Sequence, residues 1–390
     1  MDTQRFSRIA NGIKSASISS VTQTADALRR EGKEVLVFSI GRPDFDTPEH
    51  IKAAANDALA KGFVHYTHNR GILPMREAVA AYLKRQNGLD YDPKTEIMIT
   101  AGAQEALMLC THALLDPGDE VLVPSPGFLL YYSSIPMLHA VPVPYVLKEP
   151  DYDWDGAPVS DRTKLMIFNN PNNPTGTVYT RSTMEKLADF CIRHDLLCVV
   201  DQCFEDSVFD GHEYVSMMAL PGMWERTITI GSISKGMGLC GFRVAYIVAP
   251  ESITDVFHQT AVLFIGATNT MAQAGITAAL KDTRFMEDMR QEWMIRADIL
   301  GSILDTIPHI RYVKPQAGFF FWIDVSYYGT DEEVMRYLVQ EANVLVSTGA
   351  GFTDSTHIRI IYGCLKDREA CINAVKAVKE ALERHPKNQQ

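Results

Sequence analysis

Short apolar runs alternate with amphipathic stretches through the middle of the chain. Six of these runs have the length and composition of buried strands, and they lie at 96–100, 120–124, 164–168, 196–200, 227–231 and 243–249. Helical spacing of apolar residues fills several of the intervals between them, at 103–115, 181–194 and 269–281. This alternation of strands and helices predicts an α/β fold whose central sheet is largely parallel.

The pattern changes after about residue 285. A long amphipathic stretch leads into apolar segments that favour a more antiparallel arrangement, with further helices expected at 331–341 and 366–384. A chain of 390 residues also exceeds the size at which a single hydrophobic core stops growing. We therefore expect a large domain over 46–285, and a smaller α/β domain formed by 286–390 together with the N-terminal segment 1–45.

Composition and charge narrow the class of protein. The formal net charge of −11 argues against a nucleic-acid partner, because binding to phosphate backbones needs a basic surface. No apolar stretch approaches the roughly 18 residues of a membrane span, and the first residues lack the apolar core of a secretion signal. The seven cysteines contain no C-x-x-C pair, and the eleven histidines show no metal-ligand spacing. These patterns predict a cytoplasmic protein with reduced thiols, no bound metal, and no nucleic-acid or membrane partner.

The segment GSISKGMGLCGFR (231–243) carries two conflicting signals. Its glycines match G-x-G-x-x-G, the dinucleotide-binding pattern, and they follow a predicted strand. In that motif a helix must follow the glycines, because the helix N-terminus binds the pyrophosphate. Here another apolar strand follows instead, FRVAYIVAP. The glycines therefore do not predict a dinucleotide site, and Lys235 becomes the candidate for chemistry.

A phosphate site is predicted where a strand turns into a helix at TAGAQEALML (100–109). Gly102 makes the turn and the helix begins at Ala103, so free backbone N–H groups and the positive end of the helix dipole lie there. A tight turn alone would also explain the glycine. Hydroxyl donors and a cation for a phosphate would come from the segment that carries the lysine, namely from Ser232, Ser234 and Arg243.

Three further polar features indicate the same ligand. The turn NNPNNPTGTV (169–178) is rigid and polar, and it follows a strand, where open α/β sheets bind ligands. Asp201 comes directly after four apolar residues, where a carboxylate needs a partner such as a helix N-terminus or a cationic ring nitrogen. Arg359 lies within an apolar strand and needs a carboxylate, from the protein or from a substrate. A lysine, a phosphate site, an acid and a carboxylate-binding arginine together match the requirements of pyridoxal phosphate.

With these features, the sequence resembles the pyridoxal-phosphate-dependent class I/II aminotransferases of fold type I over roughly residues 20–385. The family's motifs occur in order, as IGRPDFDTPEHI (40–51), YTHNRGILPMREAVA (66–80), PGDEVLVPSPGFLLY (117–131), NPNNPTG (170–176) and the pattern S-x-S-K-x-x-x-x-x-G-x-R (232–243). The resemblance implies a large domain with a mostly parallel seven-stranded sheet between helices, and a smaller α/β domain. It also implies transfer of an α-amino group between an L-amino acid and a 2-oxo acid.

The resemblance also assigns roles to single residues. Lys235 would form the Schiff base and move the α-proton, and Asp201 would face the pyridine nitrogen. Substrate would be bound by Gly41, Asn173 and Arg359. Cofactor contacts are expected from Ala103, Gln104, Phe128, Asn173, Asp201, Cys203, Ser232, Ser234, Lys235 and Arg243. Tyr66 of the partner subunit would reach the cofactor phosphate, which implies a homodimer with shared active sites.

One position departs from the family pattern. The family usually carries a tyrosine three residues after the aspartate, and its hydroxyl donates to the oxygen of the cofactor ring. Here that residue is Phe204, so the Schiff base should hold its proton more tightly. Cys203 would lie on the side of Asp201 if the strand stays extended, but a thiol is a weak donor. Phe204 is either a neutral replacement or a sign of another reaction on the same fold, such as elimination, cyclisation or oxidation of an arginine-like amino acid.

The substrate side chain is not indicated by the sequence. Arg42 and Arg70 are candidates for binding an acidic side chain, but both lie in predicted loops, where a solvated arginine is the ordinary case. The neighbouring acids Asp44 and Asp46 are equally compatible with a structural role.

Overall fold

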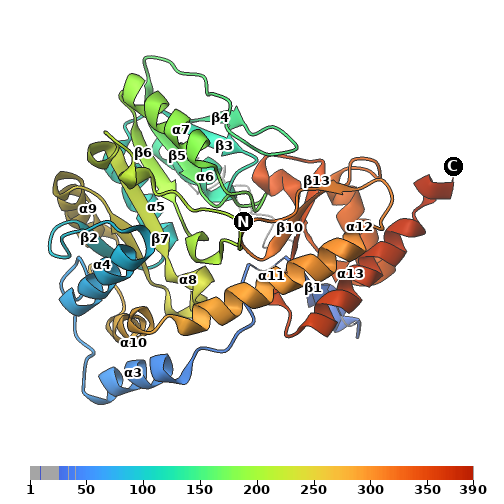
Figure 1. Cartoon of the computed structure of the whole chain (residues 1–390), viewed down its shortest axis with the longest axis horizontal. Helices are drawn as coiled ribbons and strands as arrows, with labels where there is room; N and C mark the ends of the chain where they lie inside the picture. Colours follow the sequence, from blue (N-terminus) through green and yellow to red (C-terminus); the bar gives the residue numbers. More distant parts are fainter. Residues whose placement is uncertain (1–8, 10–25, 34, 40, 390) are drawn as a thin grey trace, which may run out of the picture.

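The structure is a computed structural model that describes residue 9 and residues 26–33, 35–39 and 41–389. Its largest element is a seven-stranded sheet in the order β2-β8-β7-β6-β5-β3-β4 (Figure 1). Strand β8 runs antiparallel to both of its neighbours and the other neighbouring pairs are parallel, which confirms the mostly parallel sheet. The strands are β2 (Ile97–Thr100), β3 (Glu120–Ser125), β4 (Val141–Val146), β5 (Thr163–Asn169), β6 (Leu197–Asp201), β7 (Thr227–Ser232) and β8 (Ala245–Val248).

Strand β4 is the member of this sheet that the hydrophobic pattern does not predict. Its sequence, VPVPYV, contains Pro142 and Pro144, and proline disfavours a strand because it cannot donate a backbone hydrogen bond. The sheet accommodates both prolines because β4 lies at its edge and pairs only with β3. The edge position also explains why Val141 and Val146 are exposed.

Helices cover both faces of the large sheet (Figure 1). The three helices that the sequence predicts in this region are present to within one residue at each end, as α5 (Ala103–Leu114), α7 (Arg181–Arg193) and α10 (Thr270–Lys281). Further helices in this part of the chain are α3 (Glu49–Ala60), α4 (Leu73–Asn87), α6 (Leu129–Ser134), α8 (Ile233–Gly236) and α9 (Glu251–Phe264).

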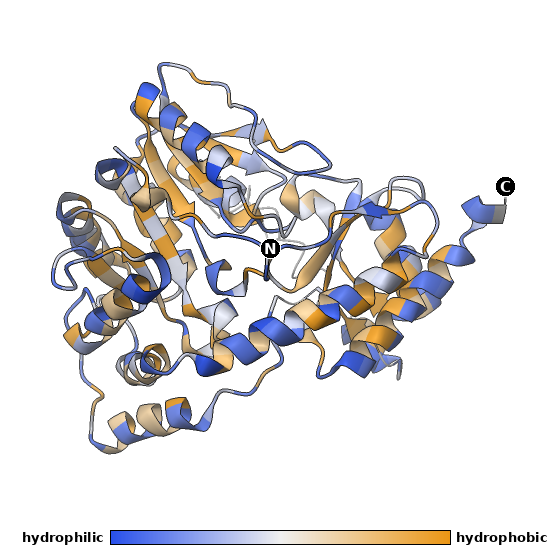
Figure 2. Cartoon of the chain, viewed as in Figure 1, coloured by the Kyte–Doolittle hydropathy of each residue, from blue (hydrophilic) through white to orange (hydrophobic). Residues whose placement is uncertain are grey.

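Alternate residues of the central strands supply two separate cores. In β5, Leu165 and Ile167 pack in one cluster with α5 and α9, whereas Met166 and Phe168 pack in another with α7. This division follows from strand geometry, in which successive side chains point to opposite faces. Apolar residues accordingly dominate the central strands, and the helices carry polar residues on their outer faces (Figure 2). Among the described residues, no helix is both long enough and apolar enough to span a bilayer.

The C-terminal part of the chain forms a second sheet, which is antiparallel and has the strand order β12-β13-β10-β9. Its strands are β9 (Arg311–Tyr312), β10 (Phe320–Asp324), β12 (Ser347–Thr348) and β13 (His357–Ile361). The accompanying helices are α11 (Arg284–Leu304), α12 (Asp331–Ala342) and α13 (Arg368–Glu383), and α11 runs from the large sheet to the small one (Figure 1). The N-terminal segment joins this part, because β1 (Leu36–Val37) pairs with β11 (Val344–Leu345).

The two faces of the small sheet differ in character. In β13, Ile358 and Ile360 join the apolar core that also contains residues of α11 and α13. His357 and Arg359 alternate with them, so they lie on the opposite face, where Trp322 of β10 is paired in register with Arg359. This polar face is turned towards the large sheet, because Arg359 donates a hydrogen bond to Asn173 in the turn after β5.

Candidate active site

The carboxyl ends of three neighbouring strands of the large sheet carry predicted site residues. Asn169 at the end of β5 is paired in register with Asp201 at the end of β6. Strand β7 lies next to β6 and runs directly into the short helix α8 (Ile233–Gly236), which contains Lys235. Because parallel strands end at the same edge of a sheet, the asparagine turn, the aspartate and the lysine meet at one place, although they are far apart in the sequence.

Lys235 is partly buried, and its Nζ donates a hydrogen bond to the carbonyl oxygen of Gly41. Burial is the main cause that lowers the pKa of Lys235; nearby thiols oppose this shift, and the guanidinium groups of Arg359 and Arg243 add to it. A Cβ atom on residue 41 would lie 3.6 Å from the Lys235 Nζ, so the chain passes close to the amine. The site therefore holds an amine that loses its proton more readily than an exposed lysine does.

The predicted phosphate site is formed by the N-terminus of α5 and the guanidinium group of Arg243. Gly102, with a φ angle of +88°, turns the chain into α5, and a Cβ atom there would collide with Nη2 of Arg243. Within the described part of the chain, this guanidinium group donates to the carbonyl oxygen of Cys240, at 3.0 Å, and pairs with no carboxylate. A cation beside the positive end of a helix dipole suits an anionic ligand.

The other predicted phosphate contacts lie at the starts of two helices. The Ser232 hydroxyl caps α8 by accepting a hydrogen bond from the backbone N–H of Ser234, at 3.2 Å, and both serines are buried. Ala103 and Gln104 are the first two residues of α5. These four residues therefore present hydroxyl and backbone N–H groups at the ends of β7 and β2, beside the turns that carry Lys235 and Gly102.

Asp201 is held by two donors. Its Oδ2 accepts a hydrogen bond from the Tyr131 hydroxyl at 2.7 Å, and its Oδ1 accepts one from the backbone N–H of Cys203 at 3.1 Å. Tyr131 is fully buried, and burial together with the charge of Asp201 raises its pKa well above the ordinary value. The sequence reasoning missed Tyr131 as the partner of Asp201, although it lies one helical turn after Phe128 and the two rings meet edge to face at 5.7 Å.

Arg359 is buried on the polar face of the small sheet. Its Nη1 donates to Asn173 Oδ1 at 2.6 Å, its Nη2 approaches the Ser347 hydroxyl at 3.5 Å, and its Nε has no partner in the part of the chain that the structure describes. The Phe352 ring lies over the guanidinium group at 4.4 Å, and burial lowers the pKa of Arg359 to about 9. Among the described residues no carboxylate pairs with Arg359, so it keeps donors for a ligand.

Phe204 and Cys203 lie in the turn that follows β6. The Phe204 ring packs edge to face against Phe319 and Phe320, with centroid distances of 5.7 and 5.3 Å, so it belongs to the core of the small sheet. Strand β6 ends at Asp201, but the Cys203 thiol still lies close to the Asp201 carboxylate and to Lys235, because burial and the charge of Asp201 raise the pKa of this thiol and Lys235 opposes the shift. The backbone N–H of Cys203 also donates to Oδ1 of Asp201.

Tyr66 does not pack into the body of its own chain. Its side chain is 94% exposed, in the segment between α3 and α4. A hydrogen bond to α10 fixes the backbone of that segment: the Thr270 hydroxyl, at the start of α10, donates to the carbonyl oxygen of His65 at 3.0 Å. The geometry therefore presents an exposed phenol from a fixed piece of backbone.

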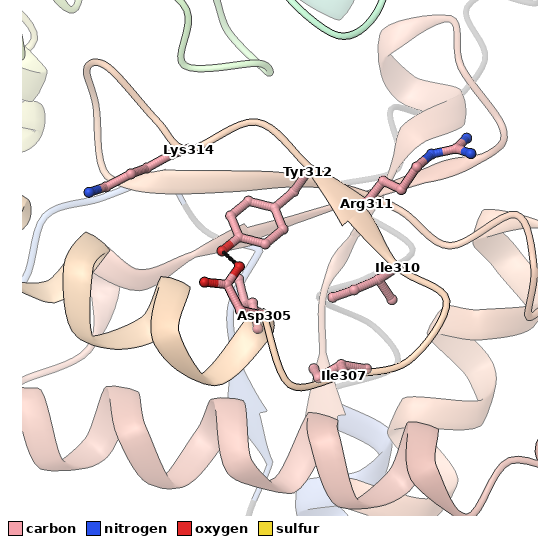
Figure 3. Close-up of a pocket in the computed structure, with 7 residues that line it drawn as sticks. Asp305, Ile307, Ile310, Arg311, Tyr312 and Lys314 are labelled. Atoms are coloured by element: carbon pink, nitrogen blue, oxygen red, sulfur yellow. Dashed lines mark hydrogen bonds between the residues drawn. The ribbon is translucent and has the colours of Figure 1, made fainter.

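A separate open pocket of about 450 Å³ lies beside the end of α11 and β9 (Figure 3). Tyr312 and Asp305 face each other in it, with a hydrogen bond of 2.6 Å between the hydroxyl and the carboxylate. The two cationic side chains that line it already have carboxylate partners. Arg311 pairs with a carboxylate of β10, and Lys314 pairs with a carboxylate of α11. None of the predicted site residues lines this pocket.

Comparison with known proteins identifies the family. The family described as aminotransferase class I and II matches residues 33–378. The aromatic-amino-acid aminotransferase 2 of Thermococcus litoralis is 35% identical over 359 residues, which cover 89% of this chain and 92% of that protein. A probable aspartate/prephenate aminotransferase of Aquifex aeolicus is 33% identical over 390 residues, which cover 97% of this chain and 98% of the relative.

The solved structures agree with this result. Thermus thermophilus aspartate aminotransferase with maleate superposes with a TM-score of 0.90 at 31% identity, covering 96% of this chain and 99% of that one. The resemblance inferred from the motifs is thus confirmed over nearly the whole chain. The chain belongs to the class I and II aminotransferases, which are pyridoxal-phosphate-dependent transferases of fold type I.

Proposed function

We propose that this aminotransferase exchanges the α-amino group between an L-amino acid and a 2-oxo acid in the space between Lys235 and Arg359. The carrying observation is that a lysine with a lowered pKa lies near a buried guanidinium group that has no carboxylate partner among the described residues. They are close enough for the charge of Arg359 to help lower the pKa of Lys235. An α-amino acid suits this pair, because its reacting carbon carries an amine, which would lie towards Lys235, and a carboxylate, which would bind Arg359.

The residues of the site fit pyridoxal phosphate. Its phosphate suits the N-terminus of α5, where Gly102 leaves room for the Arg243 guanidinium group and no described carboxylate competes for it. Ser232 and Ser234 would add donors, and Lys235 would bind the aldehyde as a Schiff base. When bound, the cofactor stabilises the negative charge that develops on the α-carbon of the substrate.

Asp201 is proposed to keep the nitrogen of the cofactor ring protonated. Each of its oxygens already accepts one hydrogen bond, from Tyr131 and from the Cys203 backbone, so the carboxylate is fixed in orientation and still has free lone pairs. Phe128, which packs against Tyr131, would stack on the ring, and Asn173 would contact the ring hydroxyl.

Lys235 is proposed to remove and return the α-proton. A general base works best when its pKa lies near the working pH, and burial lowers the pKa of Lys235 in that direction. The Gly41 carbonyl accepts from Nζ and orients it. Arg359 and Gly41 would hold the substrate carboxylate, so that the α-carbon lies within reach of the amine.

Incubation of the holoenzyme with a panel of L-amino acids, without any 2-oxo acid, tests this proposal. An aminotransferase releases a stoichiometric amount of 2-oxo acid and then stops, because the amino group stays on the enzyme. A lyase or an oxidase keeps turning over and releases ammonia or consumes oxygen. Continuous ammonia release, or continuous oxygen consumption, would therefore contradict amino transfer as the main reaction.

The panel should include aromatic and acidic amino acids, because the relatives carry the names of aromatic-amino-acid and aspartate aminotransferases. Of the two arginines considered for an acidic side chain, Arg70 is buried and engaged by Asp255 and by the Thr95 carbonyl oxygen. Arg42 is 61% exposed, and its carboxylate partner Asp44 is 3.6 Å away. Arg42 is therefore the candidate that stays available for an acidic substrate.

Phe204→Tyr is expected to lower the pH at which the visible absorption of the bound cofactor changes, by roughly one pH unit or more. The added hydroxyl would donate to the negatively charged ring oxygen, and a hydrogen bond to a charged group contributes about 1.5–3 kcal/mol. Phe319→Tyr, in the same aromatic cluster, is the matched control and should leave the titration unchanged. A Phe204→Tyr titration that superposes on the wild-type curve would contradict the assigned role of this position.

We propose a homodimer in which each chain contributes Tyr66 to the other active site. The support is an exposed apolar face near this residue, formed by residues of α9 and its C-terminal end and by the segment after α3. It consists of Phe63, Val64, Val256, Val262, Leu263, Phe264 and Ile265. Stacking of His68 on His258, with ring centroids 5.4 Å apart, brings the segment after α3 against α9. A second copy of the chain would remove this surface from water.

Leu263→Lys is expected to weaken dimerisation by about 100-fold or more, because it would bury a charge in an apolar contact. Leu263 is 83% exposed in the single chain, so the monomer should fold normally. Sedimentation over a range of protein concentrations measures the effect. Val159→Lys, at an exposed valine outside this apolar face, should keep the wild-type dimer. A monomeric wild-type protein with full activity would contradict the shared site.

Two further expectations stay predictions. The first is the division into a large domain over 46–285 and a smaller domain over 286–390 with the segment 1–45. It is supported by the distribution of strands, since the large sheet uses strands from 97 to 248 and the four-stranded small sheet uses strands from 311 to 361. Much of 1–45 lies outside the described residues. The second is the cytoplasmic location.

A further inference from the structure

His357 lies two residues before Arg359 on the polar face of the small sheet, and the proposed chemistry does not use it. Its imidazole is buried, with 3% of the residue exposed, and both ring nitrogens have partners. Nδ1 lies 2.9 Å from the Asp354 carboxylate and 2.9 Å from the Thr356 hydroxyl. Nε2 lies 3.0 Å from the Tyr152 hydroxyl, and a carboxylate oxygen of Glu149 is 3.2 Å away.

The partners of Nε2 belong to the part of the chain that forms the large sheet. Tyr152 and Glu149 lie in the loop between β4 and β5 of the large sheet. This loop is fixed to α7 at two points, because Trp154 packs against Phe190 at 5.3 Å and the Thr183 hydroxyl donates to a carboxylate of the loop at 3.0 Å. His357 therefore ties the small sheet to a rigidly held segment of the large one.

The surroundings of the imidazole on the small-sheet side are charged. Burial raises the pKa of Asp354, but hydrogen bonds from His357 and Thr356 outweigh this effect and hold the pKa at about 2. Burial raises the pKa of Asp324 of β10, which is paired in register with His357, but hydrogen bonds from Ser326 outweigh this effect and lower the pKa. Arg311 of β9 pairs with Asp324 and lies 3.9 Å from Glu149.

A series of ring contacts connects His357 with Arg359. The Trp322 indole lies on the imidazole, with ring centroids 4.9 Å apart and an angle of 6° between the planes. The same indole meets Phe352 edge to face at 5.6 Å, and the Phe352 ring lies over the Arg359 guanidinium group at 4.4 Å. Because protein interiors are close-packed, a shift of the imidazole displaces the rings that flank the guanidinium group.

We propose that His357 is a positioning residue for binding of the substrate carboxylate. Its contacts with Tyr152 and Glu149 hold Trp322 and Phe352 in place, and these rings keep the guanidinium group of Arg359 oriented. The inference rests on the proposed role of Arg359. Since His357 does not touch the α-carbon or Lys235, its loss weakens carboxylate binding without slowing the chemical step, which raises KM and leaves kcat nearly unchanged.

The test compares three variants of the holoenzyme, using the L-amino acid that reacts fastest in the panel described above. His357→Gln is expected to raise KM for the amino acid and for the 2-oxo acid by roughly 10-fold, because it removes the stacked ring and the contact with Tyr152. Tyr152→Phe removes one hydroxyl and should raise both KM values by about 3-fold. Tyr337→Phe, which removes a hydroxyl bonded to Ala381 at 3.0 Å between α12 and α13, is the control and should behave as wild type.

The double variant provides a second readout. If His357 and Tyr152 act through one link, His357→Gln combined with Tyr152→Phe raises KM no further than His357→Gln alone. Additive increases in KM overturn the proposal, and so does a fall in kcat at unchanged KM. Should His357→Gln fail to fold, Tyr152→Phe decides, because a raised KM supports the proposal and a wild-type KM overturns it.

The KM of Arg359→Leu distinguishes failure of the proposed function from failure of the positioning role of His357. Arg359→Leu with a wild-type KM refutes the role of Arg359 itself. A raised KM in Arg359→Leu, combined with wild-type KM values in His357→Gln and Tyr152→Phe, overturns only the positioning role. The visible absorption of the bound cofactor should match wild type in the His357 and Tyr152 variants, because neither residue is assigned to cofactor binding.

Discussion

Replacement of Lys235 by alanine is expected to slow amino transfer by at least about 1000-fold and to remove the covalent attachment of the cofactor. A positioned general base contributes about 10²- to 10⁴-fold to a rate, and Lys235 is proposed to supply both this base and the covalent bond. The rate is measured in a single turnover with excess L-amino acid, followed by the change in cofactor absorption. Added methylamine should restore part of the rate, because a small amine can occupy the space that the side chain leaves.

Lys164→Ala is the matched control for this prediction. Lys164 lies at the start of β5 in the same sheet, is partly exposed, and pairs with Asp119 at 3.1 Å. Its removal should leave the turnover rate unchanged. A Lys235→Ala enzyme that transfers amino groups at the wild-type rate would contradict the assignment of the lysine, whatever its effect on protein stability.

Arg359→Leu is expected to raise KM for amino acids and 2-oxo acids by about 100-fold or more. The guanidinium group is buried and has a donor without a partner among the described residues, so a carboxylate bound to it gains charge-assisted hydrogen bonds that leucine cannot supply. Leucine still fills the space beside Phe352, which limits the damage to packing. Steady-state kinetics with the L-amino acid that reacts fastest in the panel, and with its α-carboxamide, measures the effect, because only the acid has the group that the arginine binds.

The ratio of kcat/KM for the acid over the amide is the decisive quantity in this experiment. It should fall strongly in Arg359→Leu and stay at the wild-type value in Arg290→Leu. Arg290 is also largely buried, but it pairs with Glu287 and Asp210 and is assigned no part in the site. An acid-to-amide ratio unchanged in Arg359→Leu would show that another group binds the substrate carboxylate.

The residues with the clearest chemistry could be predicted from the sequence because each interrupts or ends an apolar strand. Asp201 ends β6, Lys235 follows β7, and Arg359 alternates with isoleucines in β13. A polar residue in such a position needs a partner, and this need is visible without a structure. The strand pattern then gave the mostly parallel sheet, except for β4, whose two prolines are tolerated only because it lies at an edge.

The supporting residues were missed because their role depends on contacts between distant parts of the chain. Tyr131 binds Asp201 across 70 positions, and its local signal was no more than its spacing from Phe128. His357 was visible as a polar residue in an apolar strand, but its partner Tyr152 lies 205 positions earlier in a loop without a regular pattern. Such partners follow from how the two sheets face each other, which hydrophobic periodicity does not encode.

Reduction of the holoenzyme with sodium borohydride, followed by proteolysis and mass spectrometry, shows directly which lysine carries the cofactor. Lys235 is proposed to hold pyridoxal phosphate covalently at the carboxyl edge of the large sheet. Borohydride converts the Schiff base into a stable secondary amine, so we expect a phosphopyridoxyl group on the peptide that contains Lys235, and on no other lysine. A stoichiometric modification of a different lysine, or an active enzyme in which Lys235 stays unmodified, would contradict the account.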